Sequence, residues 1–207
     1  MQSINGNTSE MMTACDQIFI NRLKTQPKAL TMAFWEKHFE WKELVRYPSI
    51  CGSVLDFGCG SGHSDVLLAR HGMTIHGIDL SPIGIAIADY FRGRENPSVQ
   101  DRVSFSVGDV TQERPEGATL YDSAWSSHVF EHISDPAPIF RGLRNWLKPG
   151  ARMLISVPLG TAYDDPGHVN HFYSAAELKS FLNSYIDVNT IDICQEYQVI
   201  RAVCIFD

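Results

Sequence analysis

The feature that most constrains the fold is an alternation of short apolar runs and helix signals that begins near Gly52. Helix starts stand between the runs, as at Ser81-Pro82, where a capping hydroxyl precedes a proline at the first helical position. Such alternation predicts an α/β fold: a doubly wound, mostly parallel sheet with helices on both faces. The last two runs are close enough in sequence to form an antiparallel C-terminal hairpin. Seven strands are expected, over residues 53–57, 74–78, 102–107, 120–126, 151–157, 186–194 and 198–206.

Composition and charge exclude several classes of partner. Apolar residues make up 44% of the 207 residues and charged residues 20%, which is typical of globular proteins. A net charge of −7 without a basic block argues against nucleic acid or an anionic membrane as a partner. No apolar run approaches the ~20 residues of a membrane span, and the polar start does not resemble a secretory signal. The five cysteines form no CxxC pair, so we expect reduced thiols and a cytoplasmic location.

A glycine-rich turn follows the first expected strand. Gly58, Gly60 and Gly62 allow the backbone to approach a ligand, and the next helix offers free N–H groups to it. The spacing is GxGxG, which is neither the dinucleotide fingerprint nor a P-loop. Asp79 ends the second expected strand, 21 residues after Gly58, the spacing at which a carboxylate can accept both hydroxyls of a ribose. We therefore expect a ligand with a ribose at the carboxyl ends of these strands.

Taken together, five motifs resemble those of class I S-adenosylmethionine-dependent methyltransferases. They occur in the order and spacing of that family, and the resemblance extends from about Val54 to the C-terminus. It implies an enzyme that uses S-adenosylmethionine as its cofactor, with a Rossmann-like methyltransferase domain over residues 51–207. The motifs are Leu55-Asp-Phe-Gly-Cys-Gly-Ser-Gly62, Gly77-Ile-Asp-Leu-Ser81, Gly108-Asp-Val110, Tyr121-Asp122 and Leu147-Lys-Pro-Gly150.

The resemblance also implies a role for each cofactor-binding residue. The three glycines would lie against the methionine part of the cofactor, and Asp56 would order their turn. Asp79 would hold the ribose hydroxyls, whereas the residues after it and after the third strand would meet the adenine. The two serines after the fourth strand would approach the sulfonium. The predicted cofactor-binding residues are Asp56, Gly58, Cys59, Gly60, Gly62, Asp79, Leu80, Asp109, Val110, Ser126 and Ser127.

Two helices are expected ahead of the sheet, one from about Met11 to Leu23 and a second from Pro27 to about Tyr47. Aromatic residues are frequent on the second helix. They are typical of a packed core, but helices placed before the first strand also cap the acceptor pocket in many small-molecule members of the family. We therefore predict that residues 1–50 form a helical segment that caps the acceptor site, in one structural unit with residues 51–207. The aromatic residues are Phe34, Trp35, Phe39 and Trp41.

Histidines gather on the expected acceptor side. His128, His168 and His171 are candidate catalytic bases, with no order among them, because a base is needed when a hydroxyl accepts the methyl group. A polar lid of hydrogen-bonded histidines is the alternative. His128 also begins an HxxEH pattern typical of zinc peptidases, but the segment runs directly into a helix start. We therefore expect no metal, with structural roles for Glu131 and His132, although Asp164, Asp165 and His168 leave a magnesium site open.

The sequence thus favours methyl transfer to a small molecule, with oxygen as the accepting atom. A macromolecular acceptor, protein or RNA, is one alternative. Ser126-Ser-His-Val129 stands where enzymes that methylate amide or base nitrogens carry an Asn-Pro-Pro-Tyr type sequence, which weighs against it. The other alternative is a catalytically inactive protein that binds the cofactor and acts as a partner. The identity of the acceptor and the choice between monomer and homodimer stay open.

Overall fold

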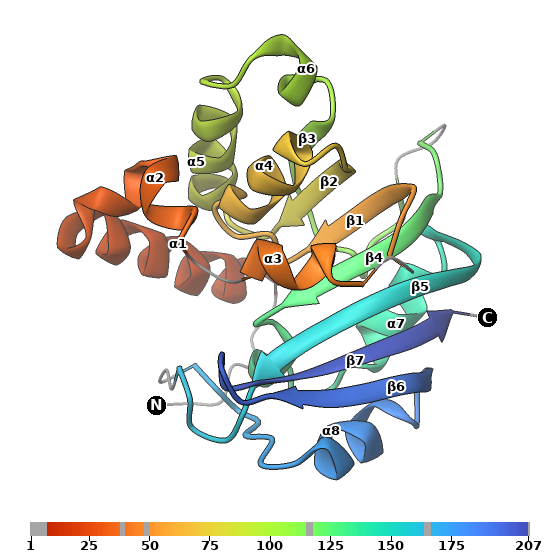
Figure 1. Cartoon of the computed structure of the whole chain (residues 1–207). Helices are drawn as coiled ribbons and strands as arrows, with labels where there is room; N and C mark the ends of the chain where they lie inside the picture. The colour runs from red at the N-terminus through yellow and green to blue at the C-terminus, as the bar shows by residue number, and fades with distance from the viewer. Residues whose placement is uncertain (1–7, 38–39, 48–49, 115–117, 164–166, 207) are drawn as a thin grey trace.

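The computed structural model describes residues 8–37, 40–47, 50–114, 118–163 and 167–206 (Figure 1). One sheet contains seven strands in the order β3-β2-β1-β4-β5-β7-β6. The first five strands are parallel, and β7 is antiparallel to both of its neighbours. The expected fold class and closing hairpin are thereby confirmed. The strands are β1 (Ser53–Phe57), β2 (Thr74–Asp79), β3 (Val103–Val107), β4 (Tyr121–Ser127), β5 (Leu147–Pro158), β6 (Asp187–Cys194) and β7 (Val199–Phe206).

Helices cover both faces of the sheet (Figure 1). Successive strand residues point to opposite faces, so Val54 and Trp125 pack with α4 and α5 while Leu55 and Ala124 pack with α7 and α8. The alternation of apolar residues along each strand therefore builds two cores, one on each face. The helices are α1 (Thr8–Thr25), η1 (Pro27–Leu30), α2 (Met32–Trp35), α3 (Glu40–Val45), α4 (His63–Arg70), α5 (Pro82–Arg92), α6 (Pro97–Gln100), η2 (Phe130–His132), α7 (Ala137–Leu143) and α8 (Ala175–Leu182).

The helix from Pro27 to Tyr47 is the largest error of the sequence prediction. Within the described residues the chain instead forms η1, α2 and α3, with an extended break at Thr31 (φ −123°, ψ 134°). The break lets Trp35 stack on His63 with ring centroids 3.6 Å apart. The indole Nε1 of Trp35 also donates to the carbonyl oxygen of Ala29 at 2.7 Å. Docking of one large aromatic side chain on α4 thus outweighs the continuity of the helical pattern.

Two smaller boundaries also differ from the prediction. The strand expected at residues 151–157 begins earlier, at Leu147, and passes through Gly150 with a φ of 77°. The β4–β5 pairing is irregular there, because the register shifts between Tyr121 and Ser123. The short helix α6 was not expected, although the side chain of Asn96 caps it by accepting from the backbone N of Val99 at 3.2 Å.

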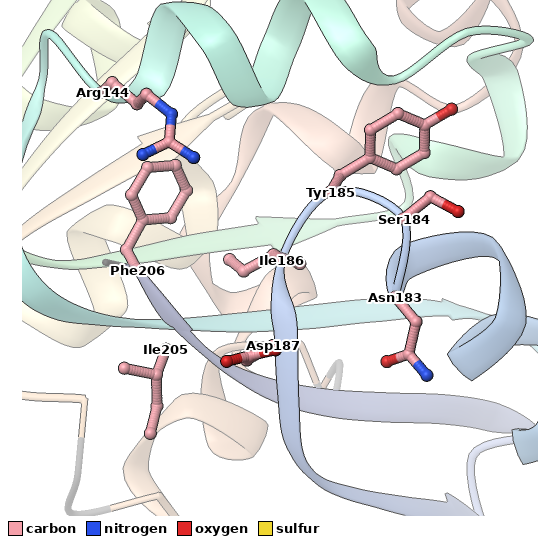
Figure 2. A pocket seen from close by; sticks show the side chains of 8 residues that line it. All are labelled: Arg144, Asn183, Ser184, Tyr185, Ile186, Asp187, Ile205 and Phe206. Atoms are coloured by element: carbon pink, nitrogen blue, oxygen red, sulfur yellow. The ribbon is translucent and has the colours of Figure 1, made fainter.

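The strand order reverses between β1 and β4, so the carboxyl ends of these strands flank the position where ligands bind in such sheets. Two surface hollows lie at the opposite edge. One, of about 210 Å³, lies where Arg144 covers the ring of Phe206 beside the segment after α8 (Figure 2). The other, of about 550 Å³, lies beside the first residues of β1 and β2. No helix in the described part of the chain has the length and apolar character that a membrane crossing requires.

Candidate active site

The turn between β1 and α4 can be built only with glycine at key positions. All three glycines have left-handed backbone conformations, with φ of 77° at Gly58, 58° at Gly60 and 63° at Gly62. A Cβ atom at Gly58 would lie 2.4 Å from Cγ2 of Val129, and one at Gly62 would lie 2.5 Å from Cβ of Ala88. The turn therefore brings bare backbone to the carboxyl edge of the sheet, where a ligand can approach it closely.

Asp79 ends β2 and connects this turn to the start of α5. Its Oδ2 accepts a hydrogen bond from the backbone N of Gly60 at 2.8 Å, and its Oδ1 accepts one from the backbone N of Ser81 at 2.8 Å. Burial raises the pKa of the Asp79 carboxyl, and the two backbone donors oppose that shift. Each carboxylate oxygen has a second lone pair, so the group can still accept two hydroxyls. The geometry suits the predicted ribose contact.

The residues predicted to meet the adenine lie next to Asp79. The backbone N of Gly108 donates to the carbonyl oxygen of Asp79 at 2.9 Å, which holds the end of β3 against the end of β2. Leu80 and Asp109 are half-buried at these two strand ends. Val110 is buried in the core instead, with 7% of its surface exposed. Leu80 and Asp109 are therefore the better placed of the three for side-chain contact with a base.

Helix α1 lies across the glycine turn, a placement that the sequence did not reveal. A Cβ atom at Gly60 would lie 3.4 Å from Cζ of Phe19, and one at Gly84 would lie 2.9 Å from its Cε2. Asp16 Oδ1 accepts the Ser81 hydroxyl, and the backbone N of Ile83 donates to the same oxygen at 3.3 Å. These contacts place α1 beside the glycine turn. That residues 1–50 cap the acceptor stays a prediction.

Two carboxyl groups are buried behind the turn. Asp56 is 4% exposed and Asp65, in the first turn of α4, is fully buried. Burial raises the pKa of Asp56 to about 7, with Asp65 opposing and Asp79 adding to the shift. Burial, followed by the charge of Asp56, raises the pKa of Asp65 well above its usual value. Burial also raises the pKa of the Cys59 thiol, so this side chain is a packing group rather than a reactive one.

A strained segment follows β4 at the same edge. Ser126, at the end of β4, is fully buried, and Ser127 is half-buried beside it. His128 has a φ of 56°, and its backbone N donates to the carbonyl oxygen of Ser156 at 2.9 Å. Tyr163, with a φ of 58°, lies edge-on to the His128 ring at 5.4 Å between centroids. Left-handed backbone costs non-glycine residues about 1–3 kcal/mol and clusters at active sites, so the strain marks both His128 and Tyr163 as candidate site residues.

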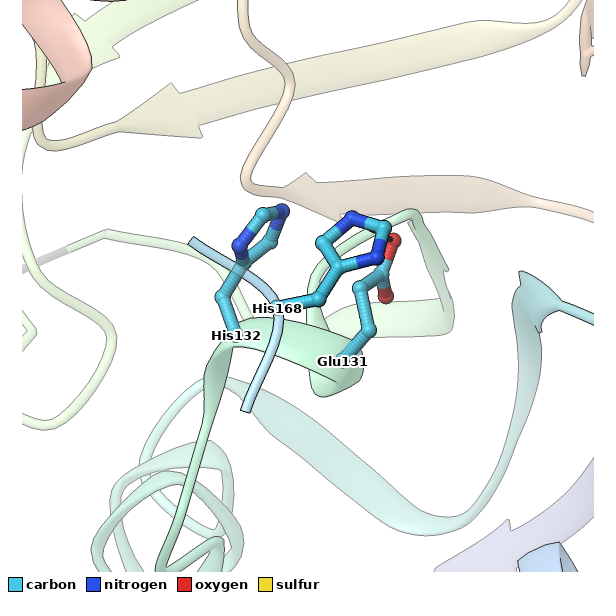
Figure 3. Close-up of side chains that lie close together, drawn as sticks. All are labelled: Glu131, His132 and His168. Carbon is cyan, nitrogen blue, oxygen red and sulfur yellow. Dashed lines mark ion pairs between the residues drawn. The ribbon is translucent and has the colours of Figure 1, made fainter. Parts of the chain in front are cut away.

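Glu131 lies at the centre of the histidines. It is 1% exposed, and its Oε1 is 3.4 Å from Nδ1 of His128 and 4.0 Å from Nε2 of His168. The rings of His132 and His168 lie 4.7 Å apart between centroids (Figure 3). His171 is exposed, with its ring centroid 6.0 Å from that of His168. The structure therefore brings His128 and His168 close to Glu131, whereas His171 is exposed and lies farther away.

Glu131 was expected to have only a structural role. The signal that could have found it is the HxxEH spacing, which places a carboxylate three residues after His128. A short 3-10 turn, η2, brings these residues to one side, and the segment carrying His168 completes the group. The magnesium alternative cannot be followed to its carboxylates, because Asp164 and Asp165 lie outside the described residues.

Two curated relatives share part of the chain. A ubiquinone biosynthesis O-methyltransferase of Pseudomonas savastanoi pv. phaseolicola is 28% identical over 141 residues, which are 62% of this chain and 59% of that protein. A protein with the same description from Xylella fastidiosa is 31% identical over 140 residues, 62% of this chain and 55% of that protein. The chain thus matches somewhat more than half the length of these relatives.

Solved structures share the fold at low sequence identity. The glycopeptide N-methyltransferase MtfA superimposes with a TM-score of 0.67 at 15% identity, over 81% of this chain and 95% of that one. Its complex with S-adenosyl-L-methionine gives a TM-score of 0.65 at 16% identity, over 81% and 93%. Geranyl diphosphate C-methyltransferase from Streptomyces coelicolor A3(2) gives 0.64 at 15% identity, over 81% and 78%.

A family model described as a methyltransferase domain matches residues 21–186, which is most of the chain. This match agrees with the glycine turn, the acid at the end of β2 and the seven-stranded sheet. It covers α4, α5 and every strand up to the start of β6. The chain therefore belongs to the family of class I S-adenosylmethionine-dependent methyltransferases.

Proposed function

We propose that this enzyme transfers the methyl group of S-adenosylmethionine to an oxygen atom of a small organic molecule. The observation that carries the proposal is the position of His128, next to buried Glu131 and directly after β4. The names of the relatives from Pseudomonas and Xylella, which are O-methyltransferases, support oxygen as the acceptor. The solved structures support the fold alone, because their identities lie below 25%.

His128 has the chemistry that an oxygen acceptor requires. The bound cofactor supplies a methyl carbon on a positively charged sulfur, which leaves as a neutral thioether when the acceptor oxygen takes the methyl group. His128 accepts the proton of the acceptor hydroxyl, and Glu131 acts as a positioning residue 3.4 Å from its Nδ1. Holding both reactants in place contributes up to about 7–11 kcal/mol, and a general base typically contributes a further 10²–10⁴-fold.

The other two candidate bases, His168 and His171, have less support. The His168 side chain is 4% exposed, compared with 24% for His128, so an acceptor reaches it less readily. His171 is exposed and lies farther from Glu131. Phe19 and Asp16 of α1 would exclude water on the cofactor side, and we extend this to the proposal that residues 1–50 cap the bound reactants.

The accepting atom can be identified with cofactor labelled by ¹³C in its methyl group. The enzyme is incubated with this cofactor and with small-molecule, protein and RNA fractions of a cell extract, and each fraction is examined by NMR. We expect a new O–CH₃ signal in the small-molecule fraction, and a weaker one with the Asp79→Asn variant at limiting cofactor. A signal from N–CH₃ or C–CH₃, or a label confined to protein or RNA, would contradict the proposal. Cofactor binding without transfer to any fraction would favour an inactive partner protein.

A further inference from the structure

Three potential metal ligands from two separate segments converge beside His128. Glu131 and His132 belong to η2, and His168 comes from the segment between β5 and α8. One ligand atom of each lies within 4.8 Å of those of the others (Figure 3). We propose that Glu131, His132 and His168 bind a divalent first-row metal ion, with zinc as the ion that this donor set fits best.

The two segments are fixed to each other by hydrogen bonds. The backbone N atoms of Val169 and Asn170 donate to the carbonyl oxygen of Glu131 at 2.8 and 3.0 Å. The side-chain Nδ2 of Asn170 donates to the carbonyl oxygens of Phe130 and Ile133 at 3.0 and 2.7 Å. These four bonds hold the residues after His168 against η2 before any ligand binds. A site assembled in this way needs little further ordering to take up an ion.

The orientation of His132 leaves one ring nitrogen available as a ligand. Its Nδ1 lies 3.2 Å from the carbonyl oxygen of Gly167. Because a carbonyl oxygen can only accept, Nδ1 must carry the proton, and Nε2 of the neutral ring then carries the lone pair. Histidines that bind metals typically donate their second ring N–H to a carbonyl or carboxylate in this way.

The buried carboxylate of Glu131 lacks a hydrogen-bond donor among the described residues. It is 1% exposed, and neither oxygen accepts a hydrogen bond from any residue that the structure describes. The contacts to imidazole nitrogens, at 3.4 and 4.0 Å, are longer than a normal hydrogen bond. A buried carboxylate is costly unless it is paired or coordinates a metal. A bound cation would supply that compensation for both oxygens.

The donor set and its spacing point to zinc. Two imidazoles and one carboxylate are a ligand set of catalytic zinc sites, which keep a fourth position open, whereas magnesium prefers oxygen ligands alone. Zinc with bonds of about 2.1 Å holds neighbouring ligand atoms about 3.4 Å apart in a tetrahedron. The present spread of up to 4.8 Å would therefore have to close by up to about 1.4 Å through side-chain rotation.

The ligand set Glu131, His132 and His168 differs from the HxxEH pattern. With it we propose a metal site where the sequence led us to expect none. In zinc peptidases that pattern lies on a helix that presents both of its histidines to the ion. Here η2 is three residues long, and His168 takes the place that the pattern would give to His128. His128 is not one of the three ligands, and metal binding is measured without turnover, so metal binding and methyl transfer can be tested separately.

The test uses the full chain freed of metal with a chelator, and cobalt(II) as a spectroscopic probe. We expect one equivalent of cobalt to give the visible absorption bands of a four- or five-coordinate ion, and zinc to displace it. Loss of a residue that only hydrogen-bonds to a metal ligand weakens metal binding by up to about 100-fold. Glu131→Gln and His168→Asn remove ligands themselves, so each should weaken cobalt binding by at least about that factor. His171→Asn is the matched control, because it removes an exposed imidazole from the same segment and should change binding less than about threefold.

Binding of S-adenosylhomocysteine to each variant reports whether it is folded. Absence of stoichiometric cobalt or zinc binding by the wild-type chain would overturn the proposal, even if every variant failed to fold. Equal binding by the wild type, Glu131→Gln and His168→Asn would also overturn it, since the ion would then lie elsewhere. Because none of these measurements uses turnover, failure of the metal site leaves the proposed methyl transfer to its own test.

Discussion

Replacing Asp79 with asparagine removes the negative charge from the end of β2 with almost no change in shape. Its two oxygens now accept from Gly60 and Ser81 at 2.8 Å each, and their remaining lone pairs are the ones we assign to the ribose. A hydrogen bond to a charged group contributes about 1.5 kcal/mol or more. Asparagine keeps one oxygen, so one charged hydrogen bond to the ribose is lost and the other becomes neutral, which together cost about 2 kcal/mol and weaken the affinity about 30-fold.

Isothermal titration with S-adenosylhomocysteine measures this effect directly. Asp89→Asn is the matched control, because it makes the same change in net charge at an exposed position of α5. We expect the control to bind like the wild type. Thermal melting of both variants shows whether the glycine turn remains folded. A dissociation constant for folded Asp79→Asn within about threefold of the wild-type value would refute the ribose assignment.

Three further changes test other parts of the site. Gly62→Ala places a methyl group 2.5 Å from Cβ of Ala88 at a left-handed backbone position, so urea denaturation should show a loss of more than about 1 kcal/mol in the free energy of unfolding. His128→Gln should lower kcat about 100-fold or more, with unchanged S-adenosylhomocysteine affinity. Because burial raises the pKa of Asp56 from 3.8 to about 7, the free energy of unfolding should decrease as pH rises from about 4 to about 7, and Asp56→Asn should flatten that decrease.

Each of these changes has an outcome that would count against its reasoning. Wild-type stability in Gly62→Ala would mean that the turn can relax away from α5. A loss in kcat of less than tenfold in His128→Gln would remove the case for a base. Urea denaturation at pH 5 and pH 7.5 decides the last prediction, because equal stability of the wild type at both values would contradict a proton held by the buried pair.

The sheet was predictable because its signals are local. Most strands contain a short apolar or alternating run, and the side chain of Ser81 caps the helix that Ser81-Pro82 predicted by accepting from the backbone N of Gly84 at 2.9 Å. The glycine turn and Asp79 were also predictable, because strand order in a parallel sheet brings their ends to the same edge. Local pattern and global fold agree in these segments.

The rest depends on contacts between residues far apart in the chain. The break at Thr31 follows from the stacking of Trp35 on His63, which no periodicity reveals. The placement of Phe19 over Gly60 depends on how α1 docks on α5. The group around Glu131 forms only because the segment with His168 folds back over η2. The spacing of residues along the chain does not predict these contacts between distant segments.

A crystal structure of the chain with S-adenosylhomocysteine would show whether the glycine turn and Asp79 hold the cofactor. We expect both ribose hydroxyls to lie within hydrogen-bond distance of the Asp79 carboxylate and the glycine turn to lie against the homocysteine part. We also expect the sulfur to lie at the carboxyl end of β4, on the side of His128. A ligand bound elsewhere, or a ribose with no contact to Asp79, would contradict the proposed site.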